Sequence, residues 1–242
     1  MTPTMTPLEI ADRLCEDLAA LRFAKPVCRV YNPLIYARAP YAEYLRRYGE
    51  RPKEVLLLGM NPGPWGMAQT GVPFGDVAMV RNWLGIEAPV GRPAHPHPGR
   101  PVEGFACQRR EVSGQRLWGW ARNNFVTPDN FFARFLVINY CPLLFIEESG
   151  RNRTPNQLPA AERRPLLAAC DAALARIAVW YKPRYLIGIG RFAESRLRQV
   201  CGQPGITIGF IPHPSPASPA ANRNWPALMD KFLSDLGIII QP

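Results

Sequence analysis

The stretch that decides the fold is VLLLGMNPGPWGMAQTGVPFGDV, residues 55–77. Its first five residues, 55–59, are a continuous apolar run ending in Gly, which predicts a β-strand buried on both faces. A long loop rich in Gly and Pro follows over residues 60–76. Loops of that length inside a compact domain usually carry function. The stretch therefore predicts a buried strand whose carboxyl end opens into a functional loop.

Three further apolar runs resemble this strand, and helical patterns alternate with them. The runs are Phe135–Asn139, Tyr185–Ile189 and Ile206–Ile211. The predicted helices span residues 7–21, 113–125, 159–181, 192–200 and 225–236. Segment 23–54 is interpreted as loop with one short helix, and segment 87–112 as an irregular excursion. The alternation predicts an α/β fold, a three-layer sandwich with a central four-stranded parallel sheet flanked by helices. Without a repeat or a linker, we expect one domain over residues 1–242.

The charge of the chain is informative about its partner. Lys and Arg number 29 and Asp and Glu 19, a formal net charge of +10. Clustered cations gain free energy by releasing counterions from nucleic acid, so the charge predicts a polyanionic partner. A basic enzyme without such a partner is the alternative.

Targeting signals and the cysteine pattern narrow the class of protein further. The longest apolar runs are far shorter than a bilayer span, and the first 18 residues lack a basic-then-apolar signal. We therefore expect no membrane association and no secretion. The expected compartment is the cytoplasm, with nucleoid association, in a bacterium, or the nucleus in a eukaryote. The six Cys occur without a CxxC pair and are interpreted as reduced thiols, which argues against a zinc or iron–sulfur site and against disulfides.

Ligands of parallel sheets bind beyond the carboxyl ends of the strands. The residues that directly follow the four predicted strands include Asn61, Asn139 and His213, and none of them is Asp or Glu. This disfavours a hydrolase with paired carboxylates at that edge. The chain also lacks a GxSxG elbow, a GK[ST] phosphate loop and a GxGxxG fingerprint there. Amide, imidazole and backbone N–H groups remain, and these suit a neutral planar heterocycle.

Uracil fits those groups. An Asn side chain can accept from uracil N3–H and donate to O4, whereas cytosine would present the reversed pattern. A His can donate to O2, where negative charge grows as a glycosidic bond breaks. Phe74, in the loop after the first strand, is a candidate ring for stacking on the base.

Each of these residues also has a purely structural interpretation. Asn61 could belong to a simple turn, and Asn139 could cap the end of a strand. Phe74 could be a core residue, and His213 a satisfied polar residue in a Pro-rich loop. His95 and His97 form an HxH pair without a third ligand nearby, so a solvated loop is preferred over a metal site. The functional interpretation is favoured because the candidates converge on one sheet edge.

Residues 59–77, the NYCPLLF segment at 139–145 and HPSPASPAANRNW at 213–225 closely resemble the single-strand-selective monofunctional uracil-DNA glycosylase family. Further similarity covers the chain from about residue 8 to 239. The resemblance implies a glycosylase that removes uracil, 5-hydroxymethyluracil and related oxidised pyrimidines from single- and double-stranded DNA. It implies no lyase step, no cofactor and no metal, and we expect a monomer.

The resemblance also implies roles for individual residues. Asn61 would position the water, Phe74 would stack on the base, Asn139 would read the uracil edge, and His213 would contact O2. Backbone groups near Met60 and Gly63 would line the pocket around C5 and O4. The remaining expected contacts are Met67 with the substrate and, with DNA, Pro214, Ser215, Pro216, Ala217, Arg223 and Arg191.

Two positions depart from the family pattern. Trp65 stands where Phe is expected, a conservative packing change. Ala217 stands where vertebrate members carry Arg, in the segment expected to wedge into DNA. Two alternative functions remain open at this point. They are a mismatch-directed uracil or thymine glycosylase, and a non-catalytic module that binds damaged DNA.

Overall fold

A parallel four-stranded sheet forms the centre of the computed structural model, which describes residues 5–238 and 240. The strand order is β3-β2-β6-β7, with pairing in register from Gly59 opposite Asn139 to Ile189 opposite Ile211. The bounds are β2 Val55–Gly59, β3 Phe135–Asn139, β6 Tyr185–Ile189 and β7 Thr207–Ile211. The strands β2 and β6 are buried along their whole length, as their continuous apolar runs predict.

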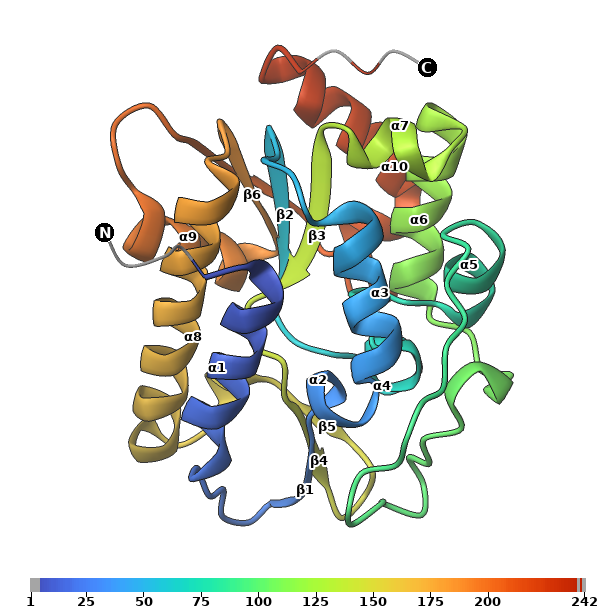
Figure 1. Cartoon of the computed structure of the whole chain (residues 1–242), viewed down its shortest axis with the longest axis vertical. Helices are drawn as coiled ribbons and strands as arrows, with labels where there is room; N and C mark the ends of the chain where they lie inside the picture. The colour runs from blue at the N-terminus through green and yellow to red at the C-terminus, as the bar shows by residue number, and fades with distance from the viewer. Residues whose placement is uncertain (1–4, 239, 241–242) are drawn as a thin grey trace.

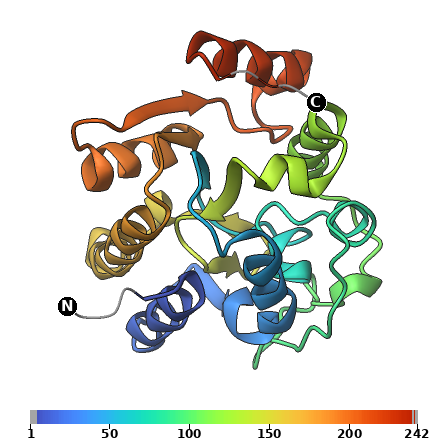
Figure 2. The ribbon, with the colours of Figure 1, turned by 45° about the horizontal axis from the view of Figure 1, so that its top comes forward.

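Helices cover both faces of this sheet, so the predicted α/β sandwich is confirmed (Figures 1 and 2). α1, α8 and α9 gather on one side, and α6 and α10 on the other. The longer helices are α1 Pro7–Ala19, α3 Arg38–Tyr48, α6 Val112–Phe125, α8 Ala160–Tyr181, α9 Arg191–Cys201 and α10 Pro219–Asp235. The shorter elements are α2 Pro33–Tyr36, α4 Met67–Thr70, α5 Val77–Asn82, α7 Pro128–Phe132, η1 Gly104–Ala106 and η2 Pro155–Gln157.

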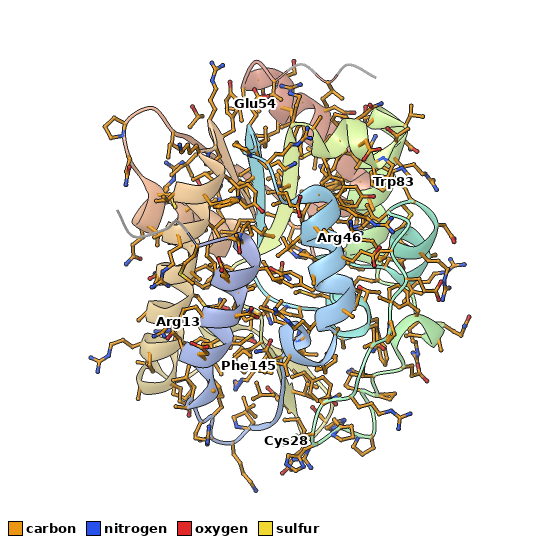
Figure 3. All side chains as sticks on the ribbon, in the orientation of Figure 1. Arg13, Cys28, Arg46, Glu54, Trp83 and Phe145 are labelled. Atoms are coloured by element: carbon orange, nitrogen blue, oxygen red, sulfur yellow. The ribbon has the colours of Figure 1, made fainter. Side chains whose placement is uncertain are left out.

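The prediction for segment 23–54 was wrong. It contains the strand β1 (Val27–Tyr31), α2 and the three-turn helix α3. β1 pairs with β4 (Leu144–Glu147), which pairs with β5 (Asn152–Arg153), and together they form a second, antiparallel sheet. In Figure 3, Glu54, just before β2, lies near one end of the molecule, and Phe145 of β4 lies in the opposite half. The carboxyl ends of the parallel strands therefore face the second sheet (Figure 1).

The last helix begins earlier than predicted. α10 starts at Pro219 and not at Trp225, and its backbone is non-helical at Asn224, two residues before Pro226. A proline inside a helix removes a backbone donor and disrupts the preceding turn, so the helix continues in two pieces across this point. The other predicted helices agree with the structure to within one or two residues at most ends. All six cysteines are free thiols.

The edge strand β3 is closed by a side chain from α3. The hydroxyl of Tyr44 donates to the carbonyl of Val137 at 2.9 Å and accepts from its N–H at 3.3 Å. The open edge of a sheet can pair with another chain. The Tyr44 hydroxyl instead satisfies the N–H and the carbonyl of Val137 on this edge. It also ties α3 to the strand that ends at Asn139.

Candidate active site

A cavity of about 390 Å³ opens where the parallel strands end. Its volume is within the range typical of small-ligand sites. Its lining comprises Met60, Asn61, Pro62, Gly63, Pro64, Gly66, Met67, Phe74, Glu111, Ser113, Asn139, Asn152, Thr154, His213 and Ser215. The structure thus brings together Asn61, Asn139 and His213, which stand at or just after the ends of three different strands, and places Phe74 beside them.

Asn61 is held by its amide nitrogen. Nδ2 donates to the carbonyl of Leu143 at 3.1 Å, in the segment between β3 and β4. This bond fixes the side chain and leaves the amide oxygen, Oδ1, as the acceptor that a water in the cavity can use. The Asn61 side chain therefore joins the loop after β2 to the segment that leads into β4.

Asn139 and Phe74 approach each other across Gly59. A Cβ on Gly59 would collide with Asn139 Oδ1 and with the Phe74 ring, so only glycine leaves room for both. The Asn139 amide nitrogen lies 3.2 Å from the sulfur of Met67, the first residue of α4. The amide is thus oriented with Oδ1 toward Phe74 and Nδ2 toward Met67.

Phe74 occupies a strained backbone conformation. Its φ is +54°, a region that a bulky residue rarely adopts and that often marks functional sites. Its carbonyl accepts from the buried Trp118 indole N–H at 3.1 Å. A Cβ on Gly114 of α6 would collide with that same carbonyl. The core therefore fixes the backbone of Phe74 while one edge of the cavity receives its ring.

His213 is neutral and presents a donor. Its Nδ1 accepts from the Ser215 N–H at 3.2 Å, so the proton of the neutral ring is on Nε2. Burial lowers the pKa of His213 to about 4, which keeps the imidazole uncharged at neutral pH. The ring lies 5.7 Å from the Phe74 ring, centroid to centroid. A base stacked on Phe74 would have this N–H beside it.

The segment after His213 is held by α6. Arg116 donates to the Pro214 carbonyl at 2.9 Å and to Asn222 Oδ1 at 3.0 Å. Asn222 Nδ2 in turn donates to the Pro216 carbonyl at 2.8 Å. Pro216, Ala217 and Arg223 are exposed. The expected wedge is therefore a fixed, solvent-facing loop.

Arg191 and Trp65 also lie outside the cavity lining. The guanidinium carbon of Arg191, at the start of α9, lies 3.8 Å from the centroid of the Phe210 ring. The same side chain forms an ion pair with Glu194. Trp65 lies between the cavity residues Pro64 and Gly66, with the guanidinium groups of Arg100 and Arg109 at 5.3 and 5.0 Å from its ring centroid. The change from Phe to Trp at position 65 therefore places a larger π surface beside two cations.

Outside the loop after β2, the sequence analysis missed four lining residues: Glu111, Ser113, Asn152 and Thr154. None of them directly follows a strand of the parallel sheet, so the strand-end rule does not find them. Glu111 caps α6 and accepts from the Ser113 N–H at 3.3 Å. Burial raises the pKa of Glu111, and the nearby Asp76 carboxylate raises it further. The motif EVSG at 111–114, an acid directly before a helix, is the signal that could have indicated a cap there.

His97, the second residue of the HxH pair, forms contacts within and between loops. His97 Nε2 lies 3.1 Å from the Glu148 carbonyl, and its Nδ1 accepts from the Gly99 N–H at 3.0 Å. Among residues 5–238 and 240, no group of three or more His, Cys, Asp or Glu side chains is arranged to hold a metal. Within the same residues, no helix is both long and apolar enough to span a bilayer.

Comparison with known proteins places this chain in a family. The profile of the uracil DNA glycosylase superfamily matches residues 46–237. A "Single-strand selective monofunctional uracil DNA glycosylase" from Bos taurus is 46% identical over 248 residues, covering 99% of this chain and 91% of that protein. The protein of that name from Mus musculus is 48% identical, covering 96% of this chain and 84% of its own length. The chain belongs to the single-strand selective monofunctional uracil-DNA glycosylase family. The predicted family, and with it a hydrolase of N-glycosyl bonds, is confirmed.

A solved structure of a more distant protein shares the fold. The crystal structure of wild-type SMUG2 from Pedobacter heparinus superposes with a TM-score of 0.63 at 19% identity, covering 94% of this chain and 97% of that one. At this identity the likeness concerns the fold alone. It supports the same three-layer architecture.

Proposed function

We propose that this protein excises uracil, 5-hydroxymethyluracil and related oxidised pyrimidines from single- and double-stranded DNA as a step of base excision repair. It hydrolyses the N-glycosidic bond and leaves an abasic site. The observation that carries the proposal is the convergence of Asn139, Phe74 and the donating Nε2–H of His213 on one cavity. These groups match the edge, the face and the O2 atom of a uracil ring.

Recognition requires the base to leave the DNA stack. An enzyme of this kind holds the phosphate backbone, turns the damaged nucleotide outward and reads the free base. The net charge of +10 supplies the attraction for the backbone. In the pocket, Asn139 Oδ1 accepts from N3–H and Nδ2 donates to O4, while the Phe74 ring stacks on the face of the base.

Bond cleavage is assisted at the leaving base. The C1′–N1 bond breaks with its electron pair going to the base, which becomes a uracil anion, and the sugar becomes oxocarbenium-like. The anion's charge is concentrated on O2, and His213 Nε2–H stabilises it by donating a hydrogen bond. A neutral imidazole performs this role without a proton transfer, which agrees with the lowered pKa of His213.

Water completes the reaction. Asn61 Oδ1 accepts a hydrogen bond from the water that adds to C1′, while Leu143 holds the opposite end of the Asn61 amide. The water oxygen forms the new bond to C1′, and its proton leaves to solvent or to the departing base. An amide is a weak base, so this site relies more on stabilising the leaving group than on activating the water.

An oligonucleotide cleavage assay tests the proposal. Matched strands carry uracil in single-stranded form, opposite A and opposite G, and alkali then reveals the abasic sites. We expect cleavage of all three uracil substrates and none of a cytosine control. Cleavage only opposite G would favour a mismatch-directed glycosylase, and binding without any cleavage would favour a non-catalytic module.

A further inference from the structure

A cluster of one tryptophan and two arginines lies beside the cavity, and the proposed mechanism gives it no task. Trp65 stands between the lining residues Pro64 and Gly66. The guanidinium carbon of Arg100 lies 5.3 Å from the centroid of the Trp65 ring, and that of Arg109 lies 5.0 Å from it. These three residues, here called the Trp65 cluster, come from three separate parts of the chain and meet next to the cavity lining.

Buried hydrogen bonds hold the backbone that carries the cluster. The Gln69 side chain is 1% exposed, and its Nε2 donates to the carbonyls of Pro64 and Pro101, each at 2.9 Å. Pro64 directly precedes Trp65, and Pro101 directly follows Arg100. The loop of Trp65 and the segment of Arg100 are therefore tied to one buried amide, so their side chains meet in a prearranged position.

The two arginines have charge and hydrogen-bond donors to spare. Among the described residues neither of them forms an ion pair with a carboxylate. Within the same part of the chain, Arg100 Nε is buried without a hydrogen-bond partner, and Arg109 is exposed. The Trp65 ring attracts both cations through its π face, but it does not accept their N–H groups as a carboxylate would. Two fixed guanidinium groups with donors to give are the chemistry that binds a phosphate.

A further cation extends this charge along the cavity. A Cβ on Gly150 would lie 3.6 Å from the guanidinium carbon of Arg100, so the turn between β4 and β5 packs against the cluster. That turn carries Arg151, which is exposed and directly precedes the lining residue Asn152. A DNA strand with one nucleotide in the cavity has phosphates on both sides of that nucleotide. A row of cations beside the cavity matches such a row of negative charges.

We propose that the Trp65 cluster binds the phosphate backbone of the DNA strand next to the nucleotide in the cavity. The inference rests on the proposed function, and it adds a second surface to the loop after His213, where contact with DNA is expected. Trp is the stronger cation–π partner and has the larger face, so the change from Phe to Trp at position 65 provides for both guanidinium groups. Because the cluster contacts the backbone and not the bases, it should raise affinity without regard to sequence.

Substitutions in the cluster separate phosphate binding from the general charge of the protein. Arg109→Gln removes an exposed cation, and the double variant Arg100→Gln/Arg109→Gln removes both cations of the cluster. Trp65→Phe keeps an aromatic side chain but offers the guanidinium groups a smaller face. Arg51→Gln is the matched control, because Arg51 is exposed and forms no ion pair among the described residues. It lies three residues before Glu54, near the amino end of β2 and away from the cavity (Figure 3).

Binding to a single-stranded oligonucleotide with one abasic-site analogue, measured over a salt series, tests the surface without depending on turnover. In the double variant we expect Kd to rise about 10- to 100-fold. The slope of log Kd against log salt should fall by about 1.4, because each lost contact with a single strand contributes about 0.7. Arg109→Gln should show about half of that slope change, and Trp65→Phe a few-fold weaker binding. Arg51→Gln should stay within about two-fold of the wild type. A double variant that behaves like Arg51→Gln overturns the proposal.

Neutral phosphate analogues locate the contact. One methylphosphonate linkage at a time replaces a phosphate on either side of the abasic site. The wild type should lose affinity at the linkages that the cluster contacts, and the double variant should lose nothing further at those linkages. The same profile of losses in both proteins would mean that the cluster does not bind phosphate, and the assignment then fails. Uracil release judges the proposed function separately: a wild type that binds this DNA through the cluster but releases no uracil disproves excision and not the surface.

Discussion

The cavity has two walls, and they are built from different parts of the fold. One wall consists of strand ends: Asn61 after β2, Asn139 at the end of β3 and His213 after β7. The other comes from the α6 cap and the second sheet and includes Glu111 and Asn152. In the proposed mechanism, the first wall carries the groups that bond to the reacting base and the water. The second wall lies beside the loop after β2, where Glu111 fills the space that Gly63 and Gly66 leave open.

The two walls differ in how the fold positions their residues. Parallel pairing in register places Gly59 opposite Asn139 and Ile189 opposite Ile211, so residues following these strands must meet at one edge. The second wall depends on contacts between distant segments, such as the Glu111 N–H on Asp76 and the pairing of Ile146 with Asn152. Substitutions in the strand-end wall should therefore change the excision rate more than substitutions in the second wall do.

The largest expected effect is on the strand-end wall. Asn61→Ala should lower single-turnover excision of uracil by about 100- to 1000-fold, because it removes the acceptor for the attacking water. Binding to abasic DNA should remain close to that of the wild type, since Asn61 faces the cavity. Equal turnover in wild type and variant would remove Asn61 from the mechanism and break the division between the walls.

The second prediction concerns the protonation of His213. Its pKa is about 4 in the folded protein and about 6.5 in the unfolded chain. The unfolded state therefore takes up a proton first as the pH falls. The stabilisation is complete above pH 6.5 and is lost progressively down to pH 4, by up to about 3 kcal/mol. In His213→Gln this part of the pH dependence should disappear.

Denaturant unfolding of wild type and variant at pH 7, 5.5 and 4.5 measures this. His95→Gln is the matched control, since it removes an imidazole from an exposed loop outside the cavity lining. If the difference in unfolding free energy between wild type and His213→Gln is the same at all three pH values, burial does not hold His213 neutral. The hydrogen bond from the Ser215 N–H would then need another explanation.

A smaller effect is expected at Asn139. In Asn139→Asp an ionised carboxylate still accepts from N3–H but no longer donates to O4, and it repels the developing anion. We expect uracil excision to slow by about 10- to 100-fold and the preference for uracil over cytosine to weaken. Excision of both bases by the variant is the measurement. An unchanged uracil rate would make Asn139 a strand-end residue that supports β3 and takes no part in recognition.

The sequence predicts the strand-end wall better than it predicts the second wall. The buried runs 55–59 and 185–189 have a continuous apolar pattern, so β2 and β6 were predicted to the residue. β1 shows no period: Val27 and Tyr31 are buried and Arg29 and Val30 exposed. β5 has only two residues. Such strands form because they pair with other strands, and their own sequence does not show it. Glu111 likewise reaches the cavity through contacts with distant residues, which a local sequence pattern does not predict.

The smallest expected effect lies at the loop beyond both walls, where Ala217 stands in place of an expected Arg. The loop is fixed by Arg116 and Asn222, and Ala217 is exposed, so Ala217→Arg adds a cation to an existing scaffold. Holding a base out of a duplex costs a few kcal/mol, which a single strand largely avoids. An added Arg that contacts phosphate or fills the vacated stack should therefore help duplex DNA most.

We expect Ala217→Arg to raise the ratio of duplex to single-strand excision a few-fold and to steepen the salt dependence of binding by about one phosphate contact. Ala175→Arg, at an exposed position on α8, adds the same charge elsewhere and should leave the ratio unchanged. Single-turnover rates on matched oligonucleotides decide between them. An unchanged ratio in Ala217→Arg would mean that another residue already fills the wedge position. Arg223, exposed in the first part of α10, would be the first to substitute, because it lies just beyond the Asn222 that holds this loop.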